Sequence, residues 1–109
     1  MKLTEYDMRF IKRVSQSDRD ANDGKFYVQE LPMGEGYIVR VNDGQGCADY
    51  YPKQKVDYLQ GFEGFQWTNV IDFEGMVSQG YFRYSSGSPV KYYEMTQKGL
   101  QVAGTLSGW

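Results

Sequence analysis

The spacing of apolar residues predicts a helix at the start of the chain. Apolar side chains recur along one helical face: Leu3, Tyr6, Phe10 and Val14, with Ile11 at its edge. Thr4 is followed three positions later by Asp7, the pattern of a capping box, in which the two side chains satisfy the free N–H groups of the first turn. The run 15–24 is rich in Ser, Asp and Asn and predicts a loop.

Three strand-like runs follow, at 26–31, 37–41 and 47–51. The first two flank a hairpin-length loop with Pro32 and two glycines. Asn42-Asp43-Gly44 comes after the second run and is a strong turn signal, because Asp-Gly tolerates the positive φ of tight hairpins. Pro52 ends the third run. The sequence therefore predicts a small three-stranded antiparallel meander.

The last third of the chain predicts a helix at 68–79, strands at 81–84 and 90–95, and a helix from residue 96 toward 106. Thr68 is the expected N-cap of the first of these helices, and Thr96 that of the second. Gly80 stands at the C′ position, where helices often need a left-handed residue. The segment 53–64 is ambiguous and favours a short helix broken by glycines.

One phrase in this region resembles a known family. The pattern is a helix end, a glycine-containing loop and a helix start. The helix end is Met76-Val77-Ser78-Gln79-Gly80-Tyr81-Phe82, and the helix start is Tyr93-Glu94-Met95-Thr96-Gln97-Lys98-Gly99-Leu100. The pattern is similar to the C-terminal helix, wing and helix of winged helix-turn-helix domains. Met95 stands where the family usually has Leu, which is a tolerated exchange in a core. The resemblance covers about residues 68–106. The expected fold is α+β in a single domain, 1–109: an N-terminal helix, a three-stranded antiparallel meander, then a winged-helix-like helix–hairpin–helix. The meander departs from the family, whose first helices lie close together.

The resemblance implies that the helix at 68–79 is the recognition helix and the hairpin after it the wing. Candidate DNA contacts are then Asn69, Gln79, Arg83, Ser85, Ser86 and Lys91. Asn and Gln can pair with adenine. However, the predicted helix contains Asp72 and Glu74 but no Lys or Arg, and the whole chain has a formal charge of −2. Because neutralisation of phosphates supplies much of the affinity for DNA, we expect DNA to be disfavoured as a partner.

The composition argues against an enzyme. The chain has no His, which removes the commonest general base and metal ligand. Cys47 has no second cysteine to pair with, and we expect it to be a small buried residue. The Asp-rich run from Asp18 lacks the Gly and Glu that a calcium loop needs at its sixth and twelfth positions, which are Asp23 and Gln29. We therefore expect no catalysis, no metal and no cofactor.

Two further expectations concern location. No stretch of the chain has eighteen consecutive apolar residues, so we expect no transmembrane helix and no membrane partner. The first residues lack the apolar core of a signal peptide. A cytoplasmic location follows as the default.

Aromatic residues are unusually abundant, with ten Tyr, six Phe and two Trp. Exposed Tyr and Trp anchor interfaces, and the candidate interface aromatics are Tyr50, Tyr51, Phe62, Phe65, Trp67 and Trp109. Alternatively, Tyr fills the outer layer of a Leu-poor core. The sequence favours a small non-enzymatic protein that acts through protein–protein contacts or self-association as a homodimer. A DNA-binding transcriptional regulator and a small-ligand module with an aromatic-lined pocket remain as alternatives.

Overall fold

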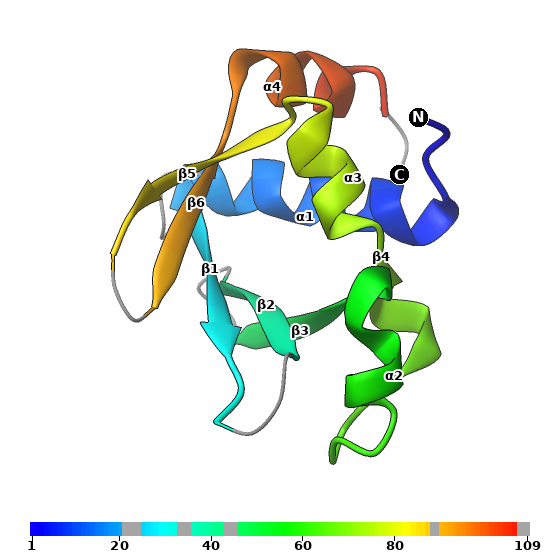
Figure 1. Cartoon of the computed structure of the whole chain (residues 1–109). Coiled ribbons are helices and arrows are strands. Elements are labelled where there is room, and N and C mark those ends of the chain that lie inside the picture. Colours follow the sequence, from blue (N-terminus) through cyan, green and yellow to red (C-terminus); the bar gives the residue numbers. More distant parts are fainter. Residues whose placement is uncertain (21–24, 33–35, 43–45, 88–89, 107–109) are drawn as a thin grey trace.

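A six-stranded sheet organises the chain (Figure 1). The computed structural model describes residues 1–20, 25–32, 36–42, 46–87 and 90–106. In chain order the elements are α1 (Glu5–Asp20), β1 (Lys25–Glu30), β2 (Tyr37–Asn42), β3 (Cys47–Pro52), the 3-10 helix η1 (Lys53–Lys55), α2 (Val56–Leu59), the 3-10 helix η2 (Trp67–Asn69), β4 (Val70–Ile71), α3 (Phe73–Ser78), β5 (Phe82–Ser86), β6 (Lys91–Met95) and α4 (Gln97–Gly104). The architecture is thus mixed α+β.

The strand order is β4-β3-β2-β1-β6-β5. All neighbouring strands are antiparallel except β3 and β4, which are parallel. The first three strands begin and end within one residue of the sequence prediction. They do not stand alone, because β6 pairs with β1 and β4 pairs with β3, so the C-terminal hairpin extends the same sheet.

The first helix is longer than predicted. It continues to Asp20, so the expectation of a loop from residue 15 is corrected for residues 15–20. The Ser15 hydroxyl donates to the Lys12 carbonyl oxygen over 2.8 Å, so this polar side chain finds a partner within the helix. Local propensity is a weak prior, and a helix already anchored by an apolar face is easily extended by polar residues.

The start of α1 has the predicted capping box. The Asp7 N–H donates to the Thr4 hydroxyl over 3.1 Å, and the Thr4 N–H donates to Asp7 Oδ2 over 2.9 Å. The other oxygen, Oδ1, accepts the backbone N–H of Asp72 over 2.8 Å. Asp7 is only 1% exposed. One buried carboxylate therefore joins the start of α1 to the segment that leads into α3.

The predicted helix at 68–79 is wrong in its first half. That part contains η2 and β4 instead, and α3 begins at Phe73 with Asp72 as its N-cap in place of Thr68. Val70 and Ile71 are β-branched and pair with the end of β3, where an extended backbone gains sheet hydrogen bonds. Asp72 accepts the Gly75 N–H over 3.0 Å, and a Cβ at Gly75 would collide with that carboxylate.

Two predicted helix boundaries in the tail are confirmed. Gly80 has a φ of +82°, and it follows α3 as a left-handed C′ residue. The N–H groups of Gly80 and Tyr81 donate to Val77 and Met76 over 2.9 and 3.0 Å, which satisfies the last carbonyls of α3. Thr96 caps α4, since its hydroxyl oxygen accepts the Gly99 N–H over 3.1 Å.

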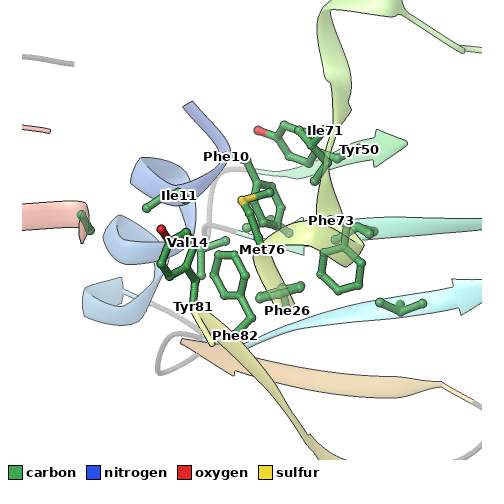
Figure 2. Packing of buried hydrophobic residues seen from close by; sticks show 14 of the residues in the cluster. Phe10, Ile11, Val14, Phe26, Tyr50, Ile71, Phe73, Met76, Tyr81 and Phe82 are labelled. Carbon is green, nitrogen blue, oxygen red and sulfur yellow. The ribbon is translucent and has the colours of Figure 1, made fainter. Parts of the chain in front are cut away.

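The main core lies between α1 and one face of the sheet (Figure 2). Phe10 is fully buried on α1, and its ring meets those of Phe26, Tyr50 and Phe82 edge-on, at centroid distances of 5.4, 4.9 and 5.5 Å. Such edge-to-face pairs add about 0.5–1.5 kcal/mol each beyond the area that they bury. Aromatic packing therefore replaces the scarce Leu and Ile of this core.

A second, smaller core of Ile38, Tyr51 and Leu59 lies on the opposite face of the sheet. Successive residues of a strand point to opposite faces, so Tyr50 enters the main core and Tyr51 the second core. Figure 1 shows α2 at the far end of the molecule from α4. The sheet is thus covered on one face by α1, α3 and α4, and at the β2–β3 end of its other face by α2.

We expect the Asp7→Ala substitution to lower the free energy of unfolding by about 1–3 kcal/mol, because it leaves the backbone N–H groups of Thr4 and Asp72 without their buried acceptor. Urea denaturation followed by circular dichroism measures this loss. The control is Glu5→Gln in the same helical turn, where an exposed side chain should change stability by less than about 0.5 kcal/mol. Equal effects of the two substitutions would contradict the proposed role of Asp7.

Candidate functional site

The structure separates the candidate DNA contacts from one another. Asn69 lies in η2, outside α3, and its side-chain amide donates to the Asp49 carbonyl oxygen over 2.9 Å. Asn69 thereby ties η2 to β3. Gln79 is the exposed C-cap residue of α3. The α3 helix itself is six residues long, and its exposed Glu74 is acidic.

The basic residues of the hairpin β5–β6 already have carboxylate partners. Arg83 Nε lies 2.8 Å from Glu94 Oε1, and Lys91 Nζ lies 3.5 Å from Glu30 Oε1. Strand alternation places Arg83 beside Glu94 on one face of the sheet, whereas Lys91 lies beside Val28 on the other. Ser85 is half-buried and Ser86 exposed. The two cations therefore do not form one phosphate-binding surface.

Two of the candidate interface aromatics are part of the core. Tyr50 is 8% exposed and Tyr51 is 2% exposed, so the expectation that they form a surface is corrected. Both faces of β3 are covered, one by α1 and the other by α2 and the loop after it. The Tyr51 hydroxyl donates to the Gly64 carbonyl oxygen over 3.0 Å, which satisfies the polar end of this ring. Trp109 lies outside the described residues.

Exposed rings gather along the segment from α2 to η2. Trp67 is 61% exposed, Tyr58 is 56% exposed and Phe62 is 36% exposed, with half-buried Phe65 between them in the chain. We call these four residues the aromatic surface. Tyr58 was missed by sequence reasoning, although it precedes Leu59, the one buried residue of α2. A helix that buries its single Leu presents its neighbours to solvent.

Three rings of the aromatic surface are connected to the second core through Tyr51. Tyr51 in the second core lies 4.8 Å from the Phe65 ring and 6.5 Å from the Phe62 ring. Phe65 in turn meets Trp67 edge-on at 5.2 Å. Phe62 and Phe65 therefore pack on a buried Tyr of β3, and Trp67 packs on Phe65.

A cavity of about 280 Å³ lies beside Trp67, between the start of α1 and β4. We call it the Trp67 pocket. Its lining residues come from α1 and the residues before it, η1, η2, β4 and the N-cap of α3: Lys2, Thr4, Tyr6, Asp7, Lys53, Trp67, Val70, Ile71 and Asp72. Sequence reasoning could not locate it, because the lining joins residues more than sixty positions apart.

Asp72 is held ionised in the wall of this pocket. Burial by itself raises the pKa of the Asp72 carboxyl. Hydrogen bonds from the Gln54 amide and the Gly75 N–H, and the nearby Lys53 ammonium, lower the pKa by more than burial raises it. The net pKa lies below the ordinary value of 3.8. Lys53 Nζ is 3.3 Å from Asp72 Oδ2. The carboxylate thus caps α3 and also orients two neighbouring side chains.

A second cavity, of about 290 Å³, lies between α3 and the sheet. Tyr37 and Glu74 are at its edge, where the Tyr37 hydroxyl donates to Glu74 Oε2 over 3.0 Å. Burial, followed by this carboxylate, raises the pKa of Tyr37 well above its ordinary value of 10.0. Lys91 and Glu30 lie in the same wall, so the cavity contains charges of both signs.

The remaining chemistry-bearing residues do not converge. Cys47 is exposed, which corrects the expectation of a buried thiol. It opens β3 one position before Ala48, whose side chain packs against the main core, so the thiol points away from that core. Within the described ranges, no group of three or more Cys, Asp and Glu side chains is placed to hold a metal ion. None of the described helices is both long and apolar enough to cross a membrane.

Comparisons with known proteins found no family model, no curated protein and no solved structure that matches the chain. What the site can do therefore rests on its own residues. These are an aromatic surface fixed on the sheet, a pocket that shares Trp67 with that surface, and a mixed-charge cavity beside α3.

The pKa of Asp72 predicts a pH-dependent stability. A carboxyl whose folded-state pKa is lowered stabilises the fold above its unfolded-state pKa, about 3.9, and this contribution is lost as the pH falls through the folded-state pKa. We expect Asp72→Asn to be less stable than the native chain at neutral pH, and the difference to narrow on acidification below about pH 4. Denaturation midpoints of the native chain and of Asp72→Asn, measured from neutral pH to below pH 4, test this expectation. Gln54→Ala should show part of the same change, whereas a difference that stays constant with pH would contradict it.

Proposed function

We propose that this chain is a small non-enzymatic binding protein that acts through protein–protein contact, with the aromatic surface as its contact site and a second copy of the chain as the partner. The observation that carries the proposal is the exposure of Trp67, 61%, next to Tyr58 and Phe62 in one short segment. Large rings exposed together are the residues that supply most of the binding energy in protein interfaces.

The ring contacts of Phe62, Phe65 and Trp67 support this proposal. Binding costs free energy when flexible side chains become ordered, and rings that are already fixed avoid much of that cost. Phe62 and Phe65 are fixed against buried Tyr51, and Trp67 against Phe65. By contrast, exposed Tyr84 and Tyr92 lie on opposite faces of the β5–β6 hairpin and form no common patch.

The charge of the segment favours a second copy as the partner. Residues 53–67 contain two Lys, one Asp and one Glu, so their formal charge is zero. In a twofold contact each patch meets an identical patch, and a patch of one sign would repel itself. A neutral aromatic patch with charges of both signs can pair with its own copy, lysines of one protomer facing carboxylates of the other.

We further propose that α3, β5, β6 and α4 form a winged-helix-like unit. The left-handed Gly80, the β5–β6 hairpin and the Thr96 cap support it. In this chain the unit contributes to the core, since Met76, Phe82 and Ala103 are buried. DNA binding is not proposed, because α3 is acidic and both hairpin cations are paired with carboxylates.

Self-association predicts that the average mass rises with concentration. We expect the native chain to pass from monomer toward dimer between micromolar and millimolar concentration, and the double variant Tyr58→Ser/Trp67→Ser to weaken the dimer by at least about tenfold, through loss of two interface rings. Sedimentation velocity or light scattering measures both.

The matched control is Leu100→Ser on α4, which removes a similarly exposed apolar side chain at 39% exposure but outside the aromatic surface. It should leave self-association unchanged. Circular dichroism shows that all variants are folded. A native chain that stays monomeric at millimolar concentration would disprove self-association.

For DNA, we expect no retention on duplex DNA even at low ionic strength, because the basic residues of the hairpin are neutralised and the chain is acidic. Electrophoretic mobility or fluorescence anisotropy tests this. Steeply salt-dependent binding that is weakened by Arg83→Gln and by Lys91→Gln would instead establish the wing as a DNA contact.

A further inference from the structure

The walls of the Trp67 pocket are mainly apolar and aromatic. The indole of Trp67 forms one side and is 61% exposed, so one of its surfaces is available to a ligand. Val70 and buried Ile71 of β4 and Tyr6 of α1 also line the pocket. The Tyr6 ring is held by Arg9, whose guanidinium lies 5.7 Å from the ring centroid. A planar apolar group fits between such walls.

The two acidic residues in the wall are already engaged. Asp7 accepts the N–H groups of Thr4 and Asp72, one on each oxygen. Asp72 accepts a hydrogen bond from Gln54 on Oδ1, and Lys53 lies beside Oδ2. The oxygens of both carboxylates are therefore already occupied by donors within the protein.

Within the part of the chain that the structure describes, the two lysines have ammonium donors without an acceptor. An ammonium group has three donors, and Lys53 directs one toward Asp72 while its side chain is 58% exposed. Lys2 is exposed, and the described part of the chain gives it no carboxylate within ion-pair distance. The rim of the pocket thus offers ammonium N–H donors beside an aromatic wall.

We propose that the Trp67 pocket binds a small planar aromatic carboxylate. The ring lies against Trp67, and the carboxylate group lies between Lys2 and Lys53. A volume of about 280 Å³ is near the lower limit of about 300–1,000 Å³ for ligand pockets, so the ligand has one or two rings. This site goes beyond the protein–protein contact and does not require it.

Naphthoate is the test ligand, and two-dimensional amide NMR spectra of the full chain are the readout. The chain contains two Trp, so the Trp109→Phe variant identifies the indole N–H signal of Trp67. At a concentration where sedimentation shows a monomer, naphthoate should shift the Trp67 signal. Naphthalenemethanol has the same rings without the charge and should bind more weakly, by roughly three- to thirty-fold, the effect of two partly exposed ion pairs.

The lysines are tested by the double variant Lys2→Gln/Lys53→Gln. We expect it to lower the affinity for naphthoate by roughly three- to thirty-fold and to leave binding of naphthalenemethanol unchanged. The matched control is Lys91→Gln, which removes an exposed ammonium group from the second cavity and should have no effect.

Three results would overturn the proposal: no shift of the Trp67 signal with millimolar naphthoate, equal affinities for the two compounds in the native chain, or naphthoate shifts centred on Tyr37 and Val77 of the second cavity. The outcome is separate from that of self-association. If the chain is monomeric at all concentrations and still binds naphthoate at Trp67, the ligand site stands and only the proposed homodimer is disproved.

Discussion

The Asp7 carboxylate holds the start of α1 and the entry to α3 together. One oxygen closes the capping box with Thr4, and the other accepts the backbone N–H of Asp72, sixty-five residues further along the chain. The Asp7 carboxylate that accepts both hydrogen bonds is buried, and loss of such an acceptor would leave its N–H donors unpaired at a cost in stability. The same contact places β4 beside α1 and so forms one wall of the Trp67 pocket. Helix, sheet edge and pocket depend on this one side chain.

Strand alternation decides which aromatics are core and which are surface. Tyr50 and Tyr51 are adjacent in sequence yet enter different cores, because consecutive side chains leave opposite faces of β3. Tyr51 then supports Phe65, and Phe65 supports Trp67. The buried Tyr thereby supports the rings of the glycine-containing loop after α2. Fixed rings suit a binding role better than mobile ones, since less conformational freedom is lost on contact.

Trp67 belongs to both the aromatic surface and the pocket. A ring that lies against its indole would therefore alter the same side chain that is proposed to contact a second copy. The two proposals connect at this residue, while their charge requirements differ. The patch is neutral over residues 53–67, whereas the pocket rim has two ammonium groups from separate parts of the chain.

The sequence by itself determined the elements whose signals are local: the capping box at Thr4 and Asp7, the strands β1, β2, β3, β5 and β6, the left-handed Gly80 and the Thr96 cap. It also identified Phe62, Phe65 and Trp67 as surface candidates. Only the tertiary structure decided that Val70 and Ile71 form a strand beside β3. It also decided that Tyr50 and Tyr51 are buried. Finally, it brought Lys2 into the same pocket as Lys53 and Trp67. Those outcomes depend on which strand or helix lies opposite, and a pairing between distant residues leaves no periodic trace in a single sequence.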